Sequence, residues 1–258
     1  ATPPKAWGER FSLQGNFKQP LLSLHEARWQ DWSGQAFGQF GKLEMAAVQA
    51  HLSLPDGFKM TQGTGWLRVW ADIKHGAVTL VTADADLQNL QAQWDAKIPA
   101  LTLRQLKGRW SSRLWGTGQE VTLRDMSLVT EDGEAWEGKS LRLAWTAALD
   151  SQAAQGELQA DQLDLDALQR IGSRLPWSAD VRQAIAAYQP KGQVNNLQAK
   201  WSGSWPTLSH YSARAQLQNL SWKSLPENAP TTWPRLPAVE GLNAELEVSP
   251  NQGKARLQ

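Results

Sequence analysis

The stretch QGELQADQLDLDALQRIGSRLPWSADVRQAIAAYQPKGQVNNLQAKWS, residues 155–202, is the one place where the alternating pattern of β-strands gives way to a helical pattern. Apolar side chains recur at steps of three or four residues from Leu165 to Leu175, and again from Val181 to Tyr188. These steps place them along one side of a helix. The sequence therefore predicts a pair of short amphipathic helices at about residues 164–188, with a strand on either side.

Both helices of this pair carry signals for their ends. Asp166 and Ser178 are of the residue types that cap helix N-termini, Pro176 separates the two runs, and Pro190 ends the second run. Because one stripe of each helix is apolar, we expect the neighbouring sheet to cover that stripe.

Outside this pair the chain alternates apolar and polar residues, as strands with one buried side do. Turn signals such as His75-Gly76, Gly116-Thr117-Gly118 and Asp132-Gly133 separate the alternating segments. We therefore expect a mainly β fold, an antiparallel sheet built from successive hairpins with one helical interruption. Residues 1–6 read as a linker, and residues 7–258 as one continuous β domain.

The alternation shifts its phase between Met45 and Val48. An extra residue in one strand has this effect, so the sequence predicts a β-bulge near Ala46 and Ala47.

The composition excludes several classes of function. Lysine and arginine together number 26 and aspartate and glutamate 25, so the basic surface of a nucleic-acid-binding protein is missing. The chain has no cysteine, which excludes disulfides, thiolate catalysis and zinc–sulfur sites. It contains 15 tryptophans but only 5 phenylalanines and 2 tyrosines, and this excess requires an explanation.

Four tryptophans share the spacing Leu-x-x-x-Trp on segments that alternate like strands. Side chains two residues apart point to the same side of a strand, so the leucine, the middle residue and the tryptophan share one side. The residues on that side are Leu90, Ala92 and Trp94; Leu106, Gly108 and Trp110; Leu141, Leu143 and Trp145; and Leu197, Ala199 and Trp201. We expect these twelve residues to form a continuous apolar face.

Such a face has to be covered. Each tryptophan removes roughly 150–250 Å² from water when buried, whereas an exposed apolar patch on a monomer rarely exceeds ~300–600 Å². Two interpretations follow from the residues alone. Either a second sheet covers the face, as in a β-sandwich, or a curved sheet holds it as an open groove for an apolar ligand.

Several segments, in order along the chain, resemble one known family. They are WQDWSGQAFGQF, GTGWLRVWADIKHGAVTLVTADADL, IPALTLRQLKGRWSSRL and GELQADQLDLDALQRIGSRLPW, followed by LQAKWSGSW and LPAVEGLNAELEV. The succession resembles the YhdP branch of the AsmA-like envelope proteins, which are similar to TamB and to bridge-like lipid transfer proteins. The resemblance covers the chain from about Trp7 onward.

The resemblance implies a long, curved, taco-like antiparallel sheet with an apolar groove that conducts phospholipids between the inner and outer membranes of Gram-negative bacteria. It implies that the twelve Leu-x-x-x-Trp residues line the groove and contact acyl chains. The chain would then be a periplasmic portion of an inner-membrane-anchored protein whose anchor and membrane contacts lie outside it. We expect a segment of a longer polypeptide, natural or engineered.

Signals for catalysis and for metals are weak. The histidines His25, His51, His75 and His210 lack ligand spacing, and Asp161, Asp164 and Asp166 read as a strand end followed by a helix cap. We therefore expect no enzymatic activity, no metal and no cofactor. Two other functions stay open at this point: a structural or assembly scaffold of the envelope with a closed sandwich core, and a carbohydrate-binding β-protein that uses exposed tryptophans.

Overall fold

The structure is a computed structural model, and it describes residues 11–18, 28–49, 57–204, 207–227, 229, 233 and 235–257. The chain divides into two compact units. Unit 1 comprises residues 1–93 and 102–137, and unit 2 comprises residues 94–101 and 138–258. The predicted linker, residues 1–6, lies outside the described residues.

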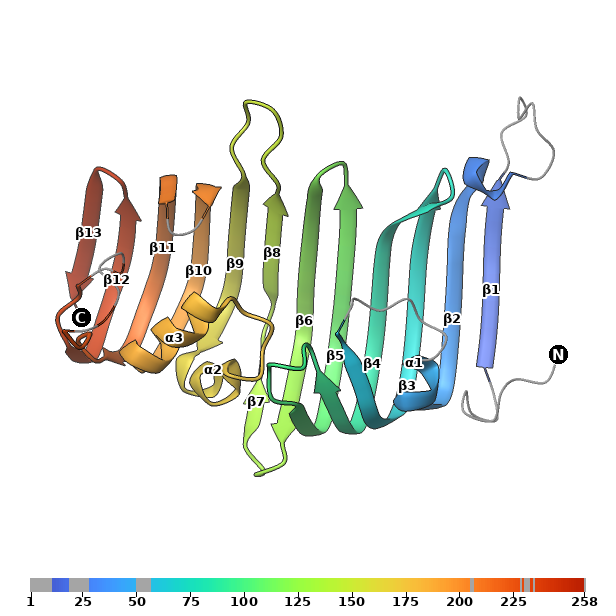
Figure 1. Ribbon diagram of the computed structural model, residues 1–258, viewed down its shortest axis with the longest axis horizontal. Coiled ribbons are helices and arrows are strands. Elements are labelled where there is room, and N and C mark those ends of the chain that lie inside the picture. The colour runs from blue at the N-terminus through green and yellow to red at the C-terminus, as the bar shows by residue number, and fades with distance from the viewer. Residues whose placement is uncertain are drawn as a thin grey trace. The chain divides into compact units, whose positions relative to one another are not determined.

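Unit 1 is built from antiparallel hairpins (Figure 1). Its strands are β1 (Phe11–Lys18), β2 (Ser33–Glu44), β3 (Lys59–Lys74), β4 (Ala77–Gln93), β5 (Leu101–Trp115, assigned to unit 1 from Thr102), β6 (Gly118–Thr130) and β7 (Ala135–Glu137). Strands β1 to β6 follow one another in the sheet in chain order, and the short β7 pairs with β6. A 3-10 helix η2 (Trp29–Asp31) precedes β2, and α1 (Met45–Gln49) follows it.

Unit 2 repeats this arrangement with two longer helices. Its strands are β8 (Leu141–Thr146), β9 (Gln155–Asp164), β10 (Lys191–Ser204), β11 (Thr207–Trp222), β12 (Val239–Ser249) and β13 (Gln252–Leu257). They too lie in chain order, each antiparallel to the next. Helices α2 (Leu165–Gly172) and α3 (Ala179–Tyr188) connect β9 to β10. The predicted mainly β, antiparallel fold with a helical pair is confirmed.

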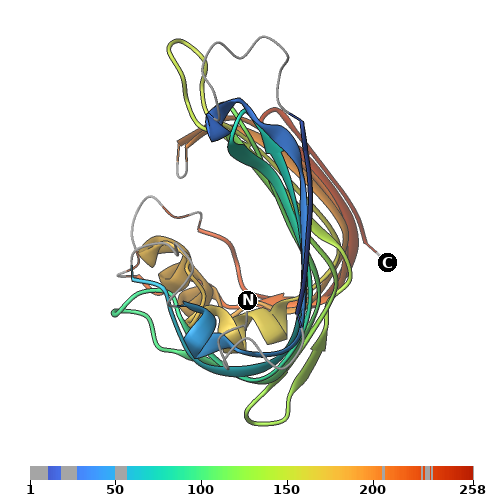
Figure 2. The same ribbon diagram turned by 90° about the vertical axis from the view of Figure 1, so that its right-hand side faces the viewer.

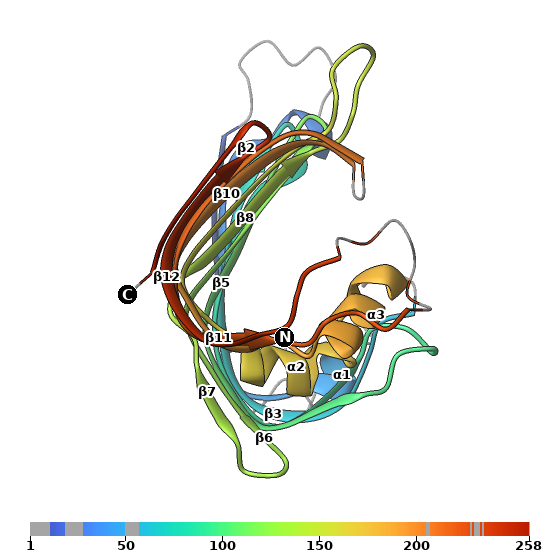
Figure 3. The ribbon, with the colours of Figure 1, turned by 90° about the vertical axis from the view of Figure 1, so that its left-hand side faces the viewer.

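Within each unit the strands bend along their length, so that the sheet has a concave and a convex side (Figures 2 and 3). Helix α1 lies on the concave side of unit 1, and α2 and α3 lie on the concave side of unit 2. Sheets curve in this way when bulges interrupt the ladder, and several pairs here shift register, for example between Phe40 and Leu43.

The caps of the helical pair are partly as predicted. Ser178 caps α3 as expected, with its Oγ accepting the backbone N–H of Val181 at 3.3 Å. The N-cap of α2 is Asp164, whose carboxylate accepts the N–H of Ala167 at 2.9 Å, so the prediction of Asp166 was wrong. Asp166 lies in the first turn and accepts the N–H of Gly192 at 2.8 Å. That bond ties α2 to the beginning of β10.

The predicted β-bulge near Ala46 and Ala47 is also wrong. These residues form α1, a single helical turn between β2 and β3, and so the helical pair is not the one helical interruption of the chain. A helical turn shifts the phase of alternation just as a bulge does, which explains the error.

Helix α1 closes one end of the concave side of unit 1. A Cβ built on Gly63 of β3 would lie 3.1 Å from Cγ of Met45 in α1 and 3.1 Å from Cδ1 of Leu90 in β4. Met45 therefore packs directly against the backbone of β3, beside Leu90. The most buried residues of unit 1 include Leu43, Met45, Leu87, Leu90, Ala92 and Leu103.

Candidate functional site

Three strands of unit 2 align their apolar residues in cross-strand rows. Directly paired residues share one side of a sheet. One row joins Leu141, Ala160 and Leu197; the next joins Leu143, Leu158 and Ala199; the third joins Trp145, Gly156 and Trp201. The sequence-predicted triplets of β8 and β10 thus lie on the same side, with β9 between them.

The apolar side continues onto the remaining strands of unit 2. Ala199 pairs with Ala213 of β11, which pairs with Val248 of β12, which pairs with Gly253 of β13. The parallel row along β11 to β13 consists of Ala215, Leu246 and Ala255. We call this surface, from Leu141 to Ala255, the apolar face of unit 2. No charged side chain interrupts these rows.

Helix α2 covers part of this face, whereas α3 packs on α2 and has no buried residue, so the expectation that the sheet covers an apolar stripe holds for α2 only. Helix α2 contacts β9 and β10, and its buried residues are Ala167, Ile171 and Gly172. At the end of α3, the ring of Tyr188 stacks on Trp233 with centroids 6.4 Å apart, and burial raises the pKa of the Tyr188 hydroxyl. The side of the sheet that faces the helices is therefore apolar and lies on the concave side (Figure 3).

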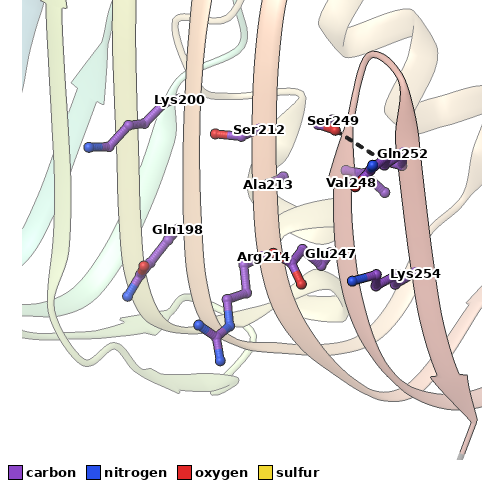
Figure 4. Close-up of a pocket in the computed structure, with 10 residues that line it drawn as sticks. All are labelled: Gln198, Lys200, Ser212, Ala213, Arg214, Glu247, Val248, Ser249, Gln252 and Lys254. Atoms are coloured by element: carbon purple, nitrogen blue, oxygen red, sulfur yellow. Dashed lines mark hydrogen bonds between the residues drawn. The ribbon is translucent and has the colours of Figure 1, made fainter.

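The opposite side of unit 2 is polar. Gln198, Lys200, Arg214 and Lys254 project from neighbouring strands there (Figure 4). Arg142 contacts Glu157 at 3.1 Å, and Lys200 contacts the other oxygen of Glu157 at 3.4 Å. The hydrogen bond from Arg142, with smaller contributions from Gln159 and Lys200, lowers the pKa of the Glu157 carboxyl. Apolar and charged residues are thus separated onto the two sides.

Gly156 is a residue of the apolar face that the sequence analysis missed. A Cβ built on Gly156 would collide with the indole of Trp201. The ring of Trp201 therefore lies flat across the backbone of β9, and only a glycine leaves room for it there. Aromatic residues often cover strand glycines in this way. The sequence holds no local signal of this contact, because it depends on the register of β9 against β10.

The apolar face of unit 2 remains partly open to solvent. Trp145 is 37% exposed, and Leu141, Leu143, Leu197, Ala199 and Trp201 are half-buried. A tryptophan in the middle of a sandwich core is buried far more completely. Within unit 2, the described strands form one sheet, with no second sheet stacked on it.

Unit 1 has an apolar side of the same kind. Rows such as Gly38, Val69 and Ala83 join β2, β3 and β4. Leu106 pairs with Leu128, and Trp110 pairs with Leu123, so this predicted triplet also lies on strand β5 in an apolar row. Trp110 is 37% exposed.

The middle residue of that triplet is Gly108, and the backbone geometry at this position admits only a glycine. It has φ of +147°, and a Cβ at this position would lie 2.5 Å from Sδ of Met126 and 2.9 Å from the carbonyl oxygen of Asp125. A side chain cannot fit here without a shift of β6. The pairing of β5 with β6 shifts its register between Lys107 and Arg109, which shows a β-bulge at this position.

The first predicted triplet, Leu90, Ala92 and Trp94, does not lie on one strand. Leu90 and Ala92 are buried at the closed end of unit 1. Trp94 is not on a strand, because β4 ends at Gln93, and the prediction that all four tryptophans lie on strands was wrong. A turn follows at once: Ile98 N–H donates to the Asp95 carbonyl at 3.0 Å, and Lys97 N–H donates to the Asp95 carboxylate at 2.8 Å.

Neither a metal centre nor a membrane span was found in the described part of the chain. No group of three or more histidine, aspartate or glutamate side chains is placed there to hold an ion. His75 and His210 are exposed, while His25 and His51 lie outside the described residues. None of the described helices has the length and hydropathy needed to cross a bilayer.

Comparison with known proteins supplies the family. The family model described as YhdP protein matches residues 1–258, the full chain. The chain belongs to the YhdP family. No curated protein and no solved structure matches this YhdP-family chain. Membership indicates, in general terms, a bridge-like lipid-transport protein of the cell envelope. The apolar, concave and partly exposed sheet face is the feature of the structure that suits such a role.

Proposed function

We propose that this YhdP-family chain is a segment of a periplasm-spanning, bridge-like protein that conducts phospholipids between the inner and outer membranes. Acyl chains would lie on the apolar, concave side of each unit, and head groups would stay in water. The observation that carries the proposal is the set of charge-free cross-strand rows of unit 2, from Leu141 to Ala255, in which Leu141, Leu143, Leu197, Ala199 and Trp201 are only half-buried and Trp145 is 37% exposed.

Energetics favour an apolar path of this kind. Moving one methylene from an apolar environment into water costs about 0.8 kcal/mol, so a sixteen-carbon acyl chain costs on the order of 12 kcal/mol. A continuous apolar surface removes most of that cost at each step. Trp145 and Trp201 supply large rigid contact surfaces, and the small residues Ala160 and Ala199 leave room in the neighbouring rows.

The proposal assigns no catalytic step to this chain and no cofactor. It expects phospholipid acyl chains as the ligand, contact with the two membranes through regions outside this chain, a periplasmic location, and no nucleic-acid partner. Ten of the twelve predicted residues keep their proposed role as lipid contacts, with Trp94 acting from the bend after β4, whereas Leu90 and Ala92 are buried and pack as core.

The main alternative is an envelope scaffold with a closed core. A scaffold needs no exposed apolar surface, and the 37% exposure of Trp110 and of Trp145 weighs against it. In that case the protein would purify without lipid, and charged substitutions in the Leu-x-x-x-Trp triplets would prevent folding.

Native mass spectrometry of the gently purified chain tests the proposal. We expect bound phospholipid in the unmodified protein and its loss in Leu141→Asp and Leu197→Asp, which place a charge on the proposed path. The matched control is Gln198→Asp, one residue further along β10 and on the polar side, which should retain lipid. Thermal melting establishes that each variant folds. Full lipid retention in folded Leu141→Asp and Leu197→Asp would exclude this face as the path.

A further inference from the structure

A second candidate site lies on the polar side of unit 1, opposite the apolar rows. Phe37 of β2 and Trp70 of β3 are direct cross-strand partners, with ring centroids 5.3 Å apart and planes inclined by 42°. They are one residue out of phase with the apolar residues Ala36 and Ala71. Trp70 is 36% exposed, so part of its indole is open to solvent beside Phe37 and Arg109.

This aromatic pair lines a shallow cleft of about 290 Å³, together with Gln14, Gly15, Asn16, Gln35, Ala36, Ala71 and Asp72. Amide side chains border it: Gln14 pairs with Phe37, and Asn16 pairs with Gln35 in the next row. Gln35 pairs with Asp72, and its Nε2 donates to the Asp72 carboxylate at 3.0 Å. Gln14, Asn16 and Gln35 are exposed, so the cleft offers several hydrogen-bond donors and acceptors around an aromatic surface.

Arg109 and Asp84 form an ion pair next to the indole of Trp70. The Arg109 guanidinium lies 5.8 Å from the Trp70 ring centroid and forms two hydrogen bonds to Asp84, at 2.5 and 2.7 Å. This bidentate contact lowers the pKa of the Asp84 carboxyl. Because Asp84 neutralises Arg109 and no lysine or arginine lines the cleft, its lining offers no unpaired positive charge to a phosphate.

We propose that this cleft, formed by Phe37 and Trp70 and bordered by Gln14, Asn16, Gln35 and Asp72, binds a pyranose ring of an uncharged glycan. A pyranose presents a flat C–H surface that stacks on an aromatic ring, and hydroxyls in its plane. Those hydroxyls both donate and accept hydrogen bonds, as neutral amides and a carboxylate at the rim require. An apolar floor with a few polar groups around it is the usual composition of a small-ligand site.

The same chemistry argues against two other occupants. An anionic ligand such as a nucleic acid or a lipid head group needs cations that are not already paired. A proline-rich peptide needs parallel aromatic ridges along an extended groove, whereas this cleft has one aromatic pair enclosed by amides. The aromatic and polar side chains of the cleft are one residue out of phase with the apolar rows and so project from the other side of β1, β2 and β3.

Titration of the full chain with two soluble tetrasaccharides tests the proposal. The probes are a β-1,4-linked glucose tetramer and its N-acetylglucosamine counterpart, followed by calorimetry and by the NMR signals of the indole N–H groups. We expect at least one probe to bind, Trp70→Ala to weaken it by at least about tenfold, and Trp70→Phe to lose less. Asp72→Ala should weaken it by about threefold, since one charge-assisted hydrogen bond is removed.

The matched control is Trp115→Ala, because Trp115 is a 42% exposed tryptophan of unit 1 that does not line the cleft. This variant should bind as the unmodified chain does, and co-purified phospholipid should be unchanged in Trp70→Ala. Three results would overturn the proposal: no tetrasaccharide binding at about 10 mM, unchanged binding in folded Trp70→Ala, or preferential binding of a proline-rich peptide to the cleft.

Discussion

The apolar sides of the two units differ in how far they are closed. In unit 1, α1 closes one end, and Leu43 and Leu103 are only 1% and 2% exposed. In unit 2, Leu143 and Leu197 stay half-exposed although two helices lie on the same side. The same alternation of apolar and polar residues therefore has two outcomes. Where the apolar side of the sheet is fully covered, its residues form a core, and where it is partly open, its residues are accessible to a ligand.

The largest difference is expected when a leucine is truncated in each region. Leu103→Ala should destabilise unit 1 by about 2–5 kcal/mol, because it leaves a cavity in a closed cluster. Leu197→Ala should cost unit 2 only about 1 kcal/mol, because water already reaches that side chain. Hydrogen exchange of β5 and β10, measured in urea, reports the two effects separately. Equal costs would mean that the face of unit 2 is as closed as the core of unit 1.

A smaller effect is expected from filling the space under Trp201. Gly156→Val places a side chain where the indole lies and should cost about 1–3 kcal/mol by forcing the ring away. Gly253→Val is the control on β13, since a Cβ there meets nothing within 4 Å; it should change stability by no more than about 0.5 kcal/mol. If both variants have the same melting temperature, the indole of Trp201 does not pack on Gly156.

The smallest effect is expected on the polar side of unit 2. The pKa of Glu157 is lowered below its ordinary value of 4.5, chiefly by the hydrogen bond from Arg142. Its contribution to stability is therefore complete above about pH 4.5 and is lost as the pH falls through the lowered pKa. Because both partners are partly exposed, Glu157→Gln should cost no more than about 1 kcal/mol at neutral pH.

A double-mutant cycle with Arg142→Gln, measured by urea unfolding between pH 3 and pH 7, isolates that coupling. A coupling energy that grows toward acid pH would contradict the assigned direction of the pKa shift.

The sequence predicted those features that depend on local periodicity. The switch from alternation to helical steps located the pair α2 and α3, and the two-residue period placed Leu141, Trp145, Leu197 and Trp201 on the same side. Side-chain parity is a property of each strand alone, so it can be read without knowing the partner strand.

Features that depend on pairing between strands were not predictable. The contact of Trp201 with Gly156, and that of Phe37 with Trp70, both require the register between two strands. Helix α1 is too short to show a helical period, so its five residues read as a phase shift. Trp94 fits the spacing rule, but the turn at Asp95 ends the strand before it.

Acyl-chain contact along β10 tests the central claim most directly. Since the chain has no cysteine, a fluorophore can be attached to single cysteines at positions 197, 198, 199, 200 and 201 in turn, and quenched by phospholipids with brominated acyl chains. We predict strong quenching at 197, 199 and 201, and weak quenching at 198 and 200, in step with the two-residue period of the strand. Equal quenching at all five positions, or stronger quenching at 198 and 200, would contradict a lipid path on the apolar face.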